Sequence, residues 1–184
     1  MKKKTLILLA DGSEETEAVT CIDFLRRADI EVSVASVGEN DIICCSRGVQ
    51  IKTDMRISEV KELPDAIVLP GGMKGTENLA KSKEVIDLIE KCFDEKKIIA
   101  AICAAPAIVL SKSKVLDNRK ATCYPGLEGR FKDKTMYIDK DVVVDDNIIT
   151  SQGPGTAAYF ALEIIRQLRD KNITDVIKKE TLVK

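Results

Sequence analysis

The sequence has no histidine and no tryptophan, and only 4% of its 184 residues are aromatic. Without imidazole, catalytic Cys-His pairs, Ser-His-Asp triads and most zinc sites are excluded. Positive charge is not in excess either, because 29 Lys and Arg residues stand against 30 Asp and Glu residues. We therefore expect no specific nucleic-acid binding and no attraction to an anionic membrane.

No apolar run has the length of a membrane span, and the run that follows the lysines at 2–4 is too short for a secretory signal. We expect a cytoplasmic protein, in which the six cysteines stay free thiols; there is no CxxC motif. Cys21 and Cys92 lie on apolar helix faces and are predicted to be core. Cys44 and Cys45 are strand neighbours and should point to opposite faces.

Strand-like and helix-like patterns alternate along the chain. One domain spanning residues 1–184 can bury about 70% of its unfolded surface. The order of elements predicts an α/β doubly wound sandwich, with a mostly parallel central sheet and helices on both faces. We expect strands at 5–10, 31–37, 66–69, 98–102 and 121–123, hairpins at 42–51 and 142–150, and helices at 13–28, 84–93, 104–110 and 157–169, with a short helix after residue 174.

The chain is organised around residues 98–106, where an apolar run leads into Cys103 and then into Ala104, Ala105 and Pro106. Such a run is typical of a strand buried on both faces, and proline is tolerated in the first turn of a helix. Cys103 is therefore predicted at a sharp strand-to-helix turn, the geometry of a nucleophile elbow. There the helix dipole favours a thiolate, and free N–H groups can receive an oxyanion. The alternative is that Cys103 is one more buried small apolar residue.

Further unusual segments fall at the carboxyl ends of predicted strands, where ligands gather in such folds: residues 11–17, Gly71-Gly72 and residues 153–155. Gly71 and Gly72 would let backbone N–H groups approach a ligand closely. The alternative is that these glycines only form a turn and have no role in binding.

The segment before the first predicted helix offers a cap and several carboxylates. Ser13 is expected to cap this helix. Glu17 is functional only if its side chain faces inward, whereas Glu14 and Glu15 are expected in solvent, near the positive end of the helix dipole.

Five strings at consistent spacing resemble the ThiJ/PfpI family, which has a flavodoxin-like fold of the class I glutamine amidotransferase type. The likeness is strongest to the branch that contains the human parkinsonism-associated protein deglycase and bacterial YajL. The strings are GSEETEAV at 12–19, CSRGV at 45–49, VLPGG at 68–72, AAICAAP at 100–106 and TSQGPGT at 150–156. They follow in order along nearly the whole chain.

The resemblance implies a reactive nucleophile at Cys103, which is easily oxidised to sulfinate, and a hydrogen bond to it from Glu17. It implies no metal ion and no cofactor. The oxyanion and substrate pocket would comprise Gly71, Gly72, Ala104, Tyr124, Gly153 and Pro154. A homodimer is also implied, with interface residues Glu14, Asp23, Arg27 and Arg47.

Two departures from the family pattern bear on mechanism. The peptidase-like branch has a histidine directly after the nucleophile, where this chain has Ala104, and this argues against peptidase activity. The human protein has a histidine near the site where this chain has Tyr124. A tyrosine can donate a hydrogen bond that orients a substrate, but it is a poor proton shuttle at neutral pH.

The resemblance and the residue chemistry together predict a glutathione-independent glyoxalase (glyoxalase III type) or a protein deglycase, acting on methylglyoxal and glyoxal or their early adducts. Cys103 would add to the aldehyde, and Glu17 would shuttle a proton through an enediol. We expect the pKa of Cys103 to be the lowest of the six thiols. The alternative function is a redox sensor or redox-regulated chaperone in which oxidation of Cys103 is the signal, either as sulfinate or through a disulfide with Cys123.

Overall fold

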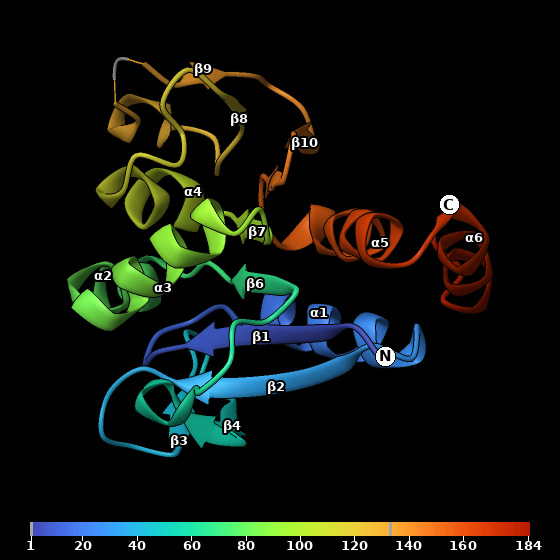
Figure 1. Cartoon of the computed structure of the whole chain (residues 1–184), viewed down its shortest axis with the longest axis horizontal. Coiled ribbons are helices and arrows are strands. Elements are labelled where there is room, and N and C mark those ends of the chain that lie inside the picture. Colours follow the sequence, from blue (N-terminus) through green and yellow to red (C-terminus); the bar gives the residue numbers. More distant parts are fainter. Residues whose placement is uncertain (1, 133) are drawn as a thin grey trace.

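The computed structural model describes residues 2–132 and 134–184. A seven-stranded sheet runs through the molecule, in the order β10-β11-β7-β6-β1-β2-β5 (Figure 1). β10 pairs antiparallel with β11, and the other pairings in this sheet are parallel. The predicted α/β fold with a mostly parallel sheet is confirmed.

The strands of the main sheet are short and mostly apolar. They are β1 (Lys4–Leu9), β2 (Glu31–Ser36), β5 (Met55–Arg56), β6 (Ala66–Leu69), β7 (Ile98–Ile102), β10 (Val142–Asp145) and β11 (Ile148–Ser151). Two small sheets stand apart from it: β3 (Ile42–Cys44) pairs antiparallel with β4 (Gln50–Lys52), and β8 (Lys120–Ala121) pairs parallel with β9 (Met136–Tyr137). The sequence did not predict β5 and β9, because a strand of two residues carries no periodic pattern.

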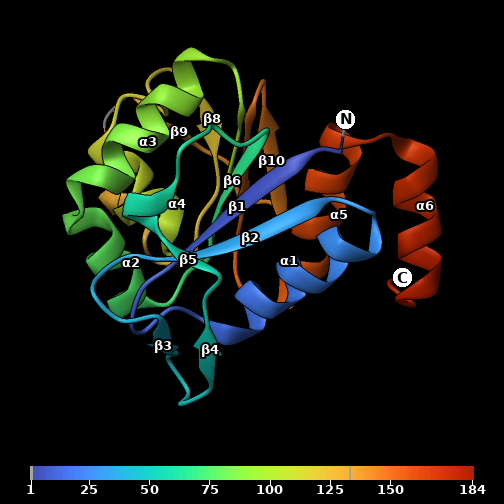
Figure 2. The same ribbon diagram turned by 60° about the horizontal axis from the view of Figure 1, so that its bottom comes forward.

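Helices cover both faces of the main sheet (Figure 2). On one side lie α1 (Glu15–Arg27) and α5 (Ala157–Leu168), with α6 (Lys171–Glu180) packed outside α5. On the other side lie α2 (Met73–Lys81), α3 (Lys83–Asp94) and α4 (Ala105–Ile108). Single 3-10 turns occur at η1 (Ile57–Glu59), η2 (Leu110–Lys112), η3 (Glu128–Arg130) and η4 (Pro154–Thr156). No helix in the described ranges is long and apolar enough to cross a membrane.

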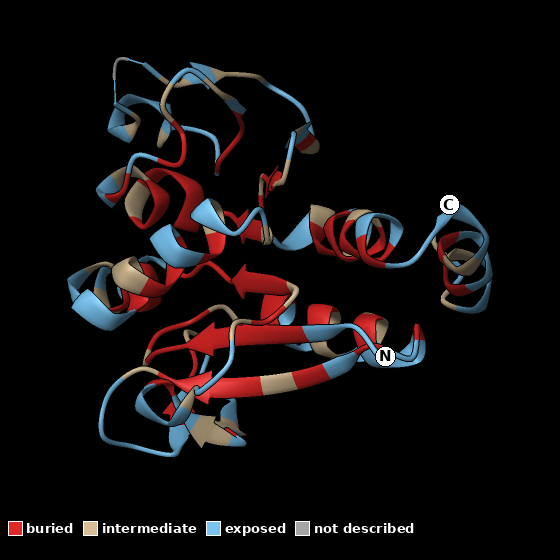
Figure 3. Ribbon diagram, in the orientation of Figure 1, coloured by how far each residue is buried: buried red, intermediate tan, exposed pale blue. Residues whose placement is uncertain are grey.

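The core has two layers, one on each face of the sheet, and Figure 3 shows the central strands buried between them. β1 illustrates the division, because alternate side chains of a strand point to opposite faces. Ile7 and Leu9 pack with α1 and α5, whereas Leu6 and Leu8 pack with α3. The sheet is therefore held rigidly from both sides, which fixes the positions of the loops at its carboxyl edge.

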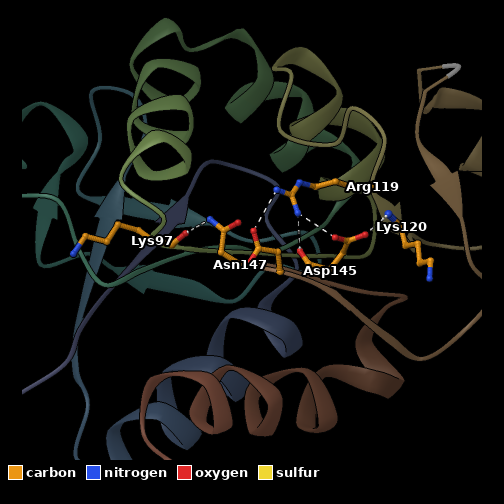
Figure 4. Close-up of polar contacts among 6 residues, drawn as sticks. Lys97, Arg119, Lys120, Asp145 and Asn147 are labelled. Carbon is orange, nitrogen blue, oxygen red and sulfur yellow. Dashed lines mark hydrogen bonds and ion pairs between the residues drawn. The ribbon is translucent and has the colours of Figure 1, made fainter.

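A polar cluster fastens β8 to the β10–β11 hairpin and to the start of β7 (Figure 4). The Asp145 carboxylate accepts from Arg119 Nη1 at 3.0 Å and from the Lys120 N–H at 2.8 Å. Asn147 Nδ2 donates to the Lys97 carbonyl at 2.7 Å. Since the ends of the Arg119–Asp145 pair are only 21% and 26% exposed, water screens this pair less than a surface pair.

The starts of two helices differ from the sequence predictions. Ser13 does not cap α1: Glu14 occupies the N-cap position, and the buried Ser13 hydroxyl accepts from the Ala10 N–H at 3.1 Å, closing the turn after β1. α6 begins at Lys171 rather than after residue 174, because Asp170 accepts from the Ile173 N–H at 2.9 Å and so caps the helix earlier.

A further difference is α2, which was not predicted at all. Its buried residues are Gly75, Thr76 and Leu79, so the apolar period that marks a helix is missing. Gly75 lies against the backbone of the loop after β1, where a Cβ would be only 2.6 Å from the Ser13 Cα. α2 is thus pressed onto the edge of the sheet where the functional segments gather.

Candidate active site

The central feature of this edge is the turn at Cys103. β7 ends at Ile102, and Cys103 has a φ of 64°, in the left-handed region that is costly for a side-chain-bearing residue. The Cys103 N–H donates to the Ser151 carbonyl at 2.9 Å, and the Tyr124 N–H donates to the Cys103 carbonyl at 2.8 Å. The chain therefore turns sharply from β7 into α4, in the nucleophile-elbow geometry that the sequence predicted.

Glu17 faces inward from the first turn of α1. Its side chain is fully buried, and Oε2 accepts from the Gly71 N–H at 2.6 Å. Burial raises the pKa of Glu17 to about 7, against the lowering effect of the Gly71 hydrogen bond and of the neighbouring Cys103 thiol. Oε1 makes no complete hydrogen bond within the described ranges, although the carboxyl and the Cys103 thiol lie close enough to shift each other's pKa. A buried oxygen without a donor is costly, so a protonated Oε1 that donates to the sulfur suits this environment.

Cys103 lies at the edge of the core with 9% of its surface exposed. Burial raises the pKa of its thiol to about 12, the negative charge of Glu17 adds to the rise, and the N–H groups of Gly72 and Ala104 oppose it. The prediction that Cys103 has the lowest pKa of the six thiols is therefore wrong, because burial and the neighbouring charge outweigh the two donors and leave its pKa above those of Cys45 and Cys92, at about 11. Both raised pKa values mean that the pair resists a second negative charge. When Glu17 holds a proton, the charge that opposes the thiolate is gone.

Gly71 and Gly72 serve the site in different ways. A Cβ at Gly71 would lie 2.8 Å from Cys103 Sγ and 2.8 Å from Glu17 Oε2, so only glycine fits between the two groups. Gly72 has a φ of 85°, and a Cβ there would collide with the loop after β1. The Gly71 N–H is already donated to Glu17, and the N–H groups of Gly72 and Ala104 are the ones that reach the Cys103 sulfur. Gly72 and Ala104 are therefore the candidate donors to an oxyanion at the sulfur, whereas the Gly71 N–H, also predicted as a donor, is engaged by Glu17.

A pocket of about 650 Å³ opens above these groups, within the size range of small-molecule sites. Tyr124 and Pro154 line it, as predicted, and Tyr124 is 49% exposed. Gly153 does not line the pocket but supports the Tyr124 ring, because a Cβ on Gly153 would be 3.3 Å from that ring.

Several pocket residues had no signal in the sequence. Met73 and Lys74 reach the wall from α2 and Cys44 reaches it from β3, whereas Asp11 belongs to the predicted segment 11–17. Finding Met73 and Lys74 would have required the position of α2, which has no apolar period.

Glu15 was expected in solvent but is buried. Its carboxylate accepts from the Arg47 N–H at 2.9 Å and from the Ser46 hydroxyl at 2.9 Å. These bonds join α1 to the turn of the β3–β4 hairpin and so fix one wall of the pocket.

The four residues predicted at a dimer interface lie on α1, at its start and on this hairpin turn. Arg27 Nε donates to Asp23 Oδ2 at 2.7 Å within α1, and the Ser46 hydroxyl shares its one proton between Glu15 and Glu14 Oε2, which lies 2.7 Å away. Arg47 forms no ion pair within residues 2–132 and 134–184, and it lines the pocket.

All six cysteines are free, as predicted. Cys21 and Cys92 are fully buried core residues, and Cys44 is exposed while Cys45 is buried, also as predicted. Cys123 is fully buried next to the elbow. In the part of the chain that the structure describes, no three acidic or cysteine side chains are arranged to hold a metal ion.

Comparison with known proteins places this geometry in a family. Residues 3–167 match the DJ-1/PfpI family. The chain is 41% identical to protein dj-1beta of Drosophila melanogaster over 185 residues, covering 100% of this chain and 98% of that protein. It is 33% identical to the glutathione-independent glyoxalase DJR-1.2 of Caenorhabditis elegans, covering 97% of this chain and 95% of that protein. The crystal structure of Drosophila melanogaster DJ-1beta superimposes with a TM-score of 0.97 over 100% of both chains. The chain therefore belongs to the DJ-1/PfpI family.

Proposed function

We propose that this protein is a cofactor-independent glyoxalase- or deglycase-type enzyme that acts on methylglyoxal and glyoxal or on their early adducts. The observation that carries the proposal is the fully buried Glu17 carboxyl beside the Cys103 thiol, with a pKa raised to about 7. A general acid-base group works best when its pKa lies near the working pH. The glyoxalase name of the nematode relative supports the same reaction class. The pocket of about 650 Å³ also has room for an adduct larger than a three-carbon aldehyde.

The reaction would begin at the aldehyde carbon of a 2-oxoaldehyde. Glu17 takes the Cys103 proton, the sulfur bonds to the carbon, and the carbonyl electron pair moves onto the aldehyde oxygen. The N–H groups of Gly72 and Ala104, which already point at the sulfur, would stabilise this oxygen. Protonated Glu17 then returns the proton to it, and a hemithioacetal results.

The second stage moves a hydrogen between two carbons. Glu17 as carboxylate removes the hydrogen of the former aldehyde carbon, and the electron pair forms an enediol. Protonated Glu17 then gives this proton to the neighbouring carbon, while the hydroxyl proton on the former aldehyde oxygen passes to the neighbouring oxygen, and a thioester of a 2-hydroxy acid results. Water cleaves the thioester, releasing lactate from methylglyoxal and restoring the thiol. One carbon is oxidised as its neighbour is reduced, so the atoms and electrons balance without an external oxidant.

Lactate formation from methylglyoxal by the purified protein tests the proposal. Cys103→Ser should lose lactate formation, since serine is a much weaker nucleophile here. Cys44→Ser is the matched control, because it removes an exposed thiol from the wall of the same pocket that could trap aldehyde without turnover. The wild type failing to form lactate, or Cys103→Ser forming it at the wild-type rate, would refute the proposal.

A second candidate is redox sensing through a Cys103 sulfinate. It is favoured by the N–H groups of Gly72 and Ala104 around the sulfur, which could bind sulfinate oxygens as well as an oxyanion. Limited peroxide treatment followed by peptide mass spectrometry should then add two oxygens to Cys103 before the fully buried Cys21, Cys92 and Cys123. The Cys44→Ser background removes the exposed competitor. If a Cys103→Ser protein gained as much oxygen as the wild type, the reactive thiol would be another cysteine.

A further inference from the structure

A second hollow lies between α2, α4 with η2, and the segment around η3, and it is separate from the pocket above Cys103. Its volume is about 460 Å³, within the range of small-molecule sites. No residue that lines it also lines the pocket above Cys103. Any ligand here would therefore occupy a place that the proposed reaction does not use.

The charge of this hollow is one-sided. Four cations line it, Lys81, Lys112, Arg130 and Lys132, against the single carboxylate of Glu77. The whole chain is nearly balanced, at 29 basic and 30 acidic residues, so this excess is local. All four cations are exposed, so solvent screens their mutual repulsion, and an anion that enters the hollow meets an excess of positive charge.

These cations have few partners in the protein. Within residues 2–132 and 134–184, none of the four forms an ion pair. Lys132 Nζ donates to the Ser113 carbonyl at 3.0 Å, a neutral acceptor that orients the lysine and leaves its charge uncompensated.

The wall of the hollow also contains a serine hydroxyl for which the described residues offer no hydrogen-bond partner. Ser111 Oγ is shielded from water and has no hydrogen-bond partner within the described ranges. A buried hydroxyl without a partner is costly. Ser111 is therefore a candidate donor to an oxyanion bound in the hollow.

We propose that this hollow binds a small organic phosphate that also carries hydroxyl groups. Arg130 suits a phosphate through its planar, bidentate guanidinium, and the lysines add point charges. Glu77 would repel a bare phosphate but accepts a hydrogen bond from a ligand hydroxyl. Ala80, Ala107 and Ile108 provide an apolar floor for the carbon skeleton. The nearly neutral chain and the confined volume argue against an extended polyanion such as RNA.

Isothermal titration at constant ionic strength tests this site. The probes are glucose 6-phosphate, glycerol 3-phosphate, inorganic phosphate and glucose. We expect saturable 1:1 binding of at least one of the two sugar or glycerol phosphates, tighter than that of inorganic phosphate, and no binding of glucose. Lys112→Glu and Arg130→Glu should each weaken the Kd at least tenfold. Lys114→Glu is the matched control, because Lys114 is exposed two residues away and does not line the hollow; its Kd should stay within twofold.

The readout is independent of lactate formation, so this site and the proposed enzyme activity can fail separately. The proposal is overturned if neither organic phosphate binds, if glucose or inorganic phosphate binds as tightly, or if all three charge variants bind alike. Tighter binding of a short RNA or of phosphatidylserine vesicles that Lys112→Glu abolishes would also overturn it, since the patch would then serve a macromolecule or a membrane.

Discussion

The Glu17 carboxyl is buried where its charged form is unfavourable. The stability of the protein should therefore depend on pH. Its pKa is raised from 4.5 to about 7 by burial. The folded state therefore holds the proton more tightly than the unfolded state, so this contribution is fully present below about pH 4.5 and is lost as the pH rises through about 7.

Glu17→Gln keeps the shape of the side chain but cannot ionise. As the pH rises from 5 to 8, the wild type should lose roughly 2–3 kcal/mol of unfolding free energy relative to this variant, at about 1.4 kcal/mol per pKa unit. Urea unfolding at several pH values measures this difference. Glu90→Gln, at an exposed position on α3, is the control and should show no such trend. A flat difference for Glu17→Gln would mean that Glu17 is not held as an acid of raised pKa.

The sequence predicted the position of a site residue correctly where that position depends only on neighbouring residues in the chain. The apolar run before Cys103 and the proline after it were sufficient to predict the elbow, which the structure shows. The Cys103 pKa could not be predicted, because it depends on the burial of both Cys103 and Glu17 and on the distance between them. Glu15 was misplaced for a similar reason, since its partners lie 31 and 32 positions away in the sequence.

At the scale of elements, we expect the partly buried contacts of Asp145 to stabilise the fold more than exposed contacts of the same kind (Figure 4). Asp145→Asn removes a charge that accepts from Arg119 and from the Lys120 N–H, and hydrogen bonds to charged groups are worth about 1.5–3 kcal/mol. We expect thermal and urea unfolding to show a loss of roughly 1–2 kcal/mol, since asparagine keeps one acceptor.

Asp146→Asn is the matched control for this change. Asp146 contacts the same arginine at 3.4 Å, but its side chain is 71% exposed, so the loss should stay below about 0.5 kcal/mol. Asparagine also tolerates the left-handed backbone at this position, where φ is 56°. Equal losses for the two variants would show that burial does not decide the strength of these contacts.

The elements that the sequence predicted well are those with a clear period or a long apolar run, such as β1, β7 and α5. α2 was missed because its buried face holds Gly75 and Thr76 and only one large apolar residue, Leu79, and β5 and β9 were missed because two residues carry no pattern. Tertiary contacts determine these elements, and a single sequence does not display them.

At the scale of the whole molecule, we expect a homodimer through α1 and the β3–β4 hairpin. Glu15 joins these two segments, which expose the apolar side chains of Val19, Ile42 and Val49, and the hairpin turn also carries Arg47. Exposed apolar side chains next to an uncompensated cation suit a protein interface.

Analytical ultracentrifugation at micromolar concentration should give the mass of two chains. Arg47→Glu should weaken the dimer, whereas Lys91→Glu, on α3 across the sheet, should leave it intact. A monomeric wild type, or equal effects of the two variants, would refute the interface.

The central claim is that Glu17 and Cys103 act together in turnover, and the rate of lactate formation by Glu17→Gln tests it most directly. This variant keeps the pocket, the elbow and the neutral form of the side chain, and it is predicted to fold at least as stably as the wild type. Loss of a general acid-base group typically costs 10²- to 10⁴-fold, so kcat with methylglyoxal should fall by about that factor while the protein remains folded. A folded Glu17→Gln protein that forms lactate at the wild-type rate would contradict the account.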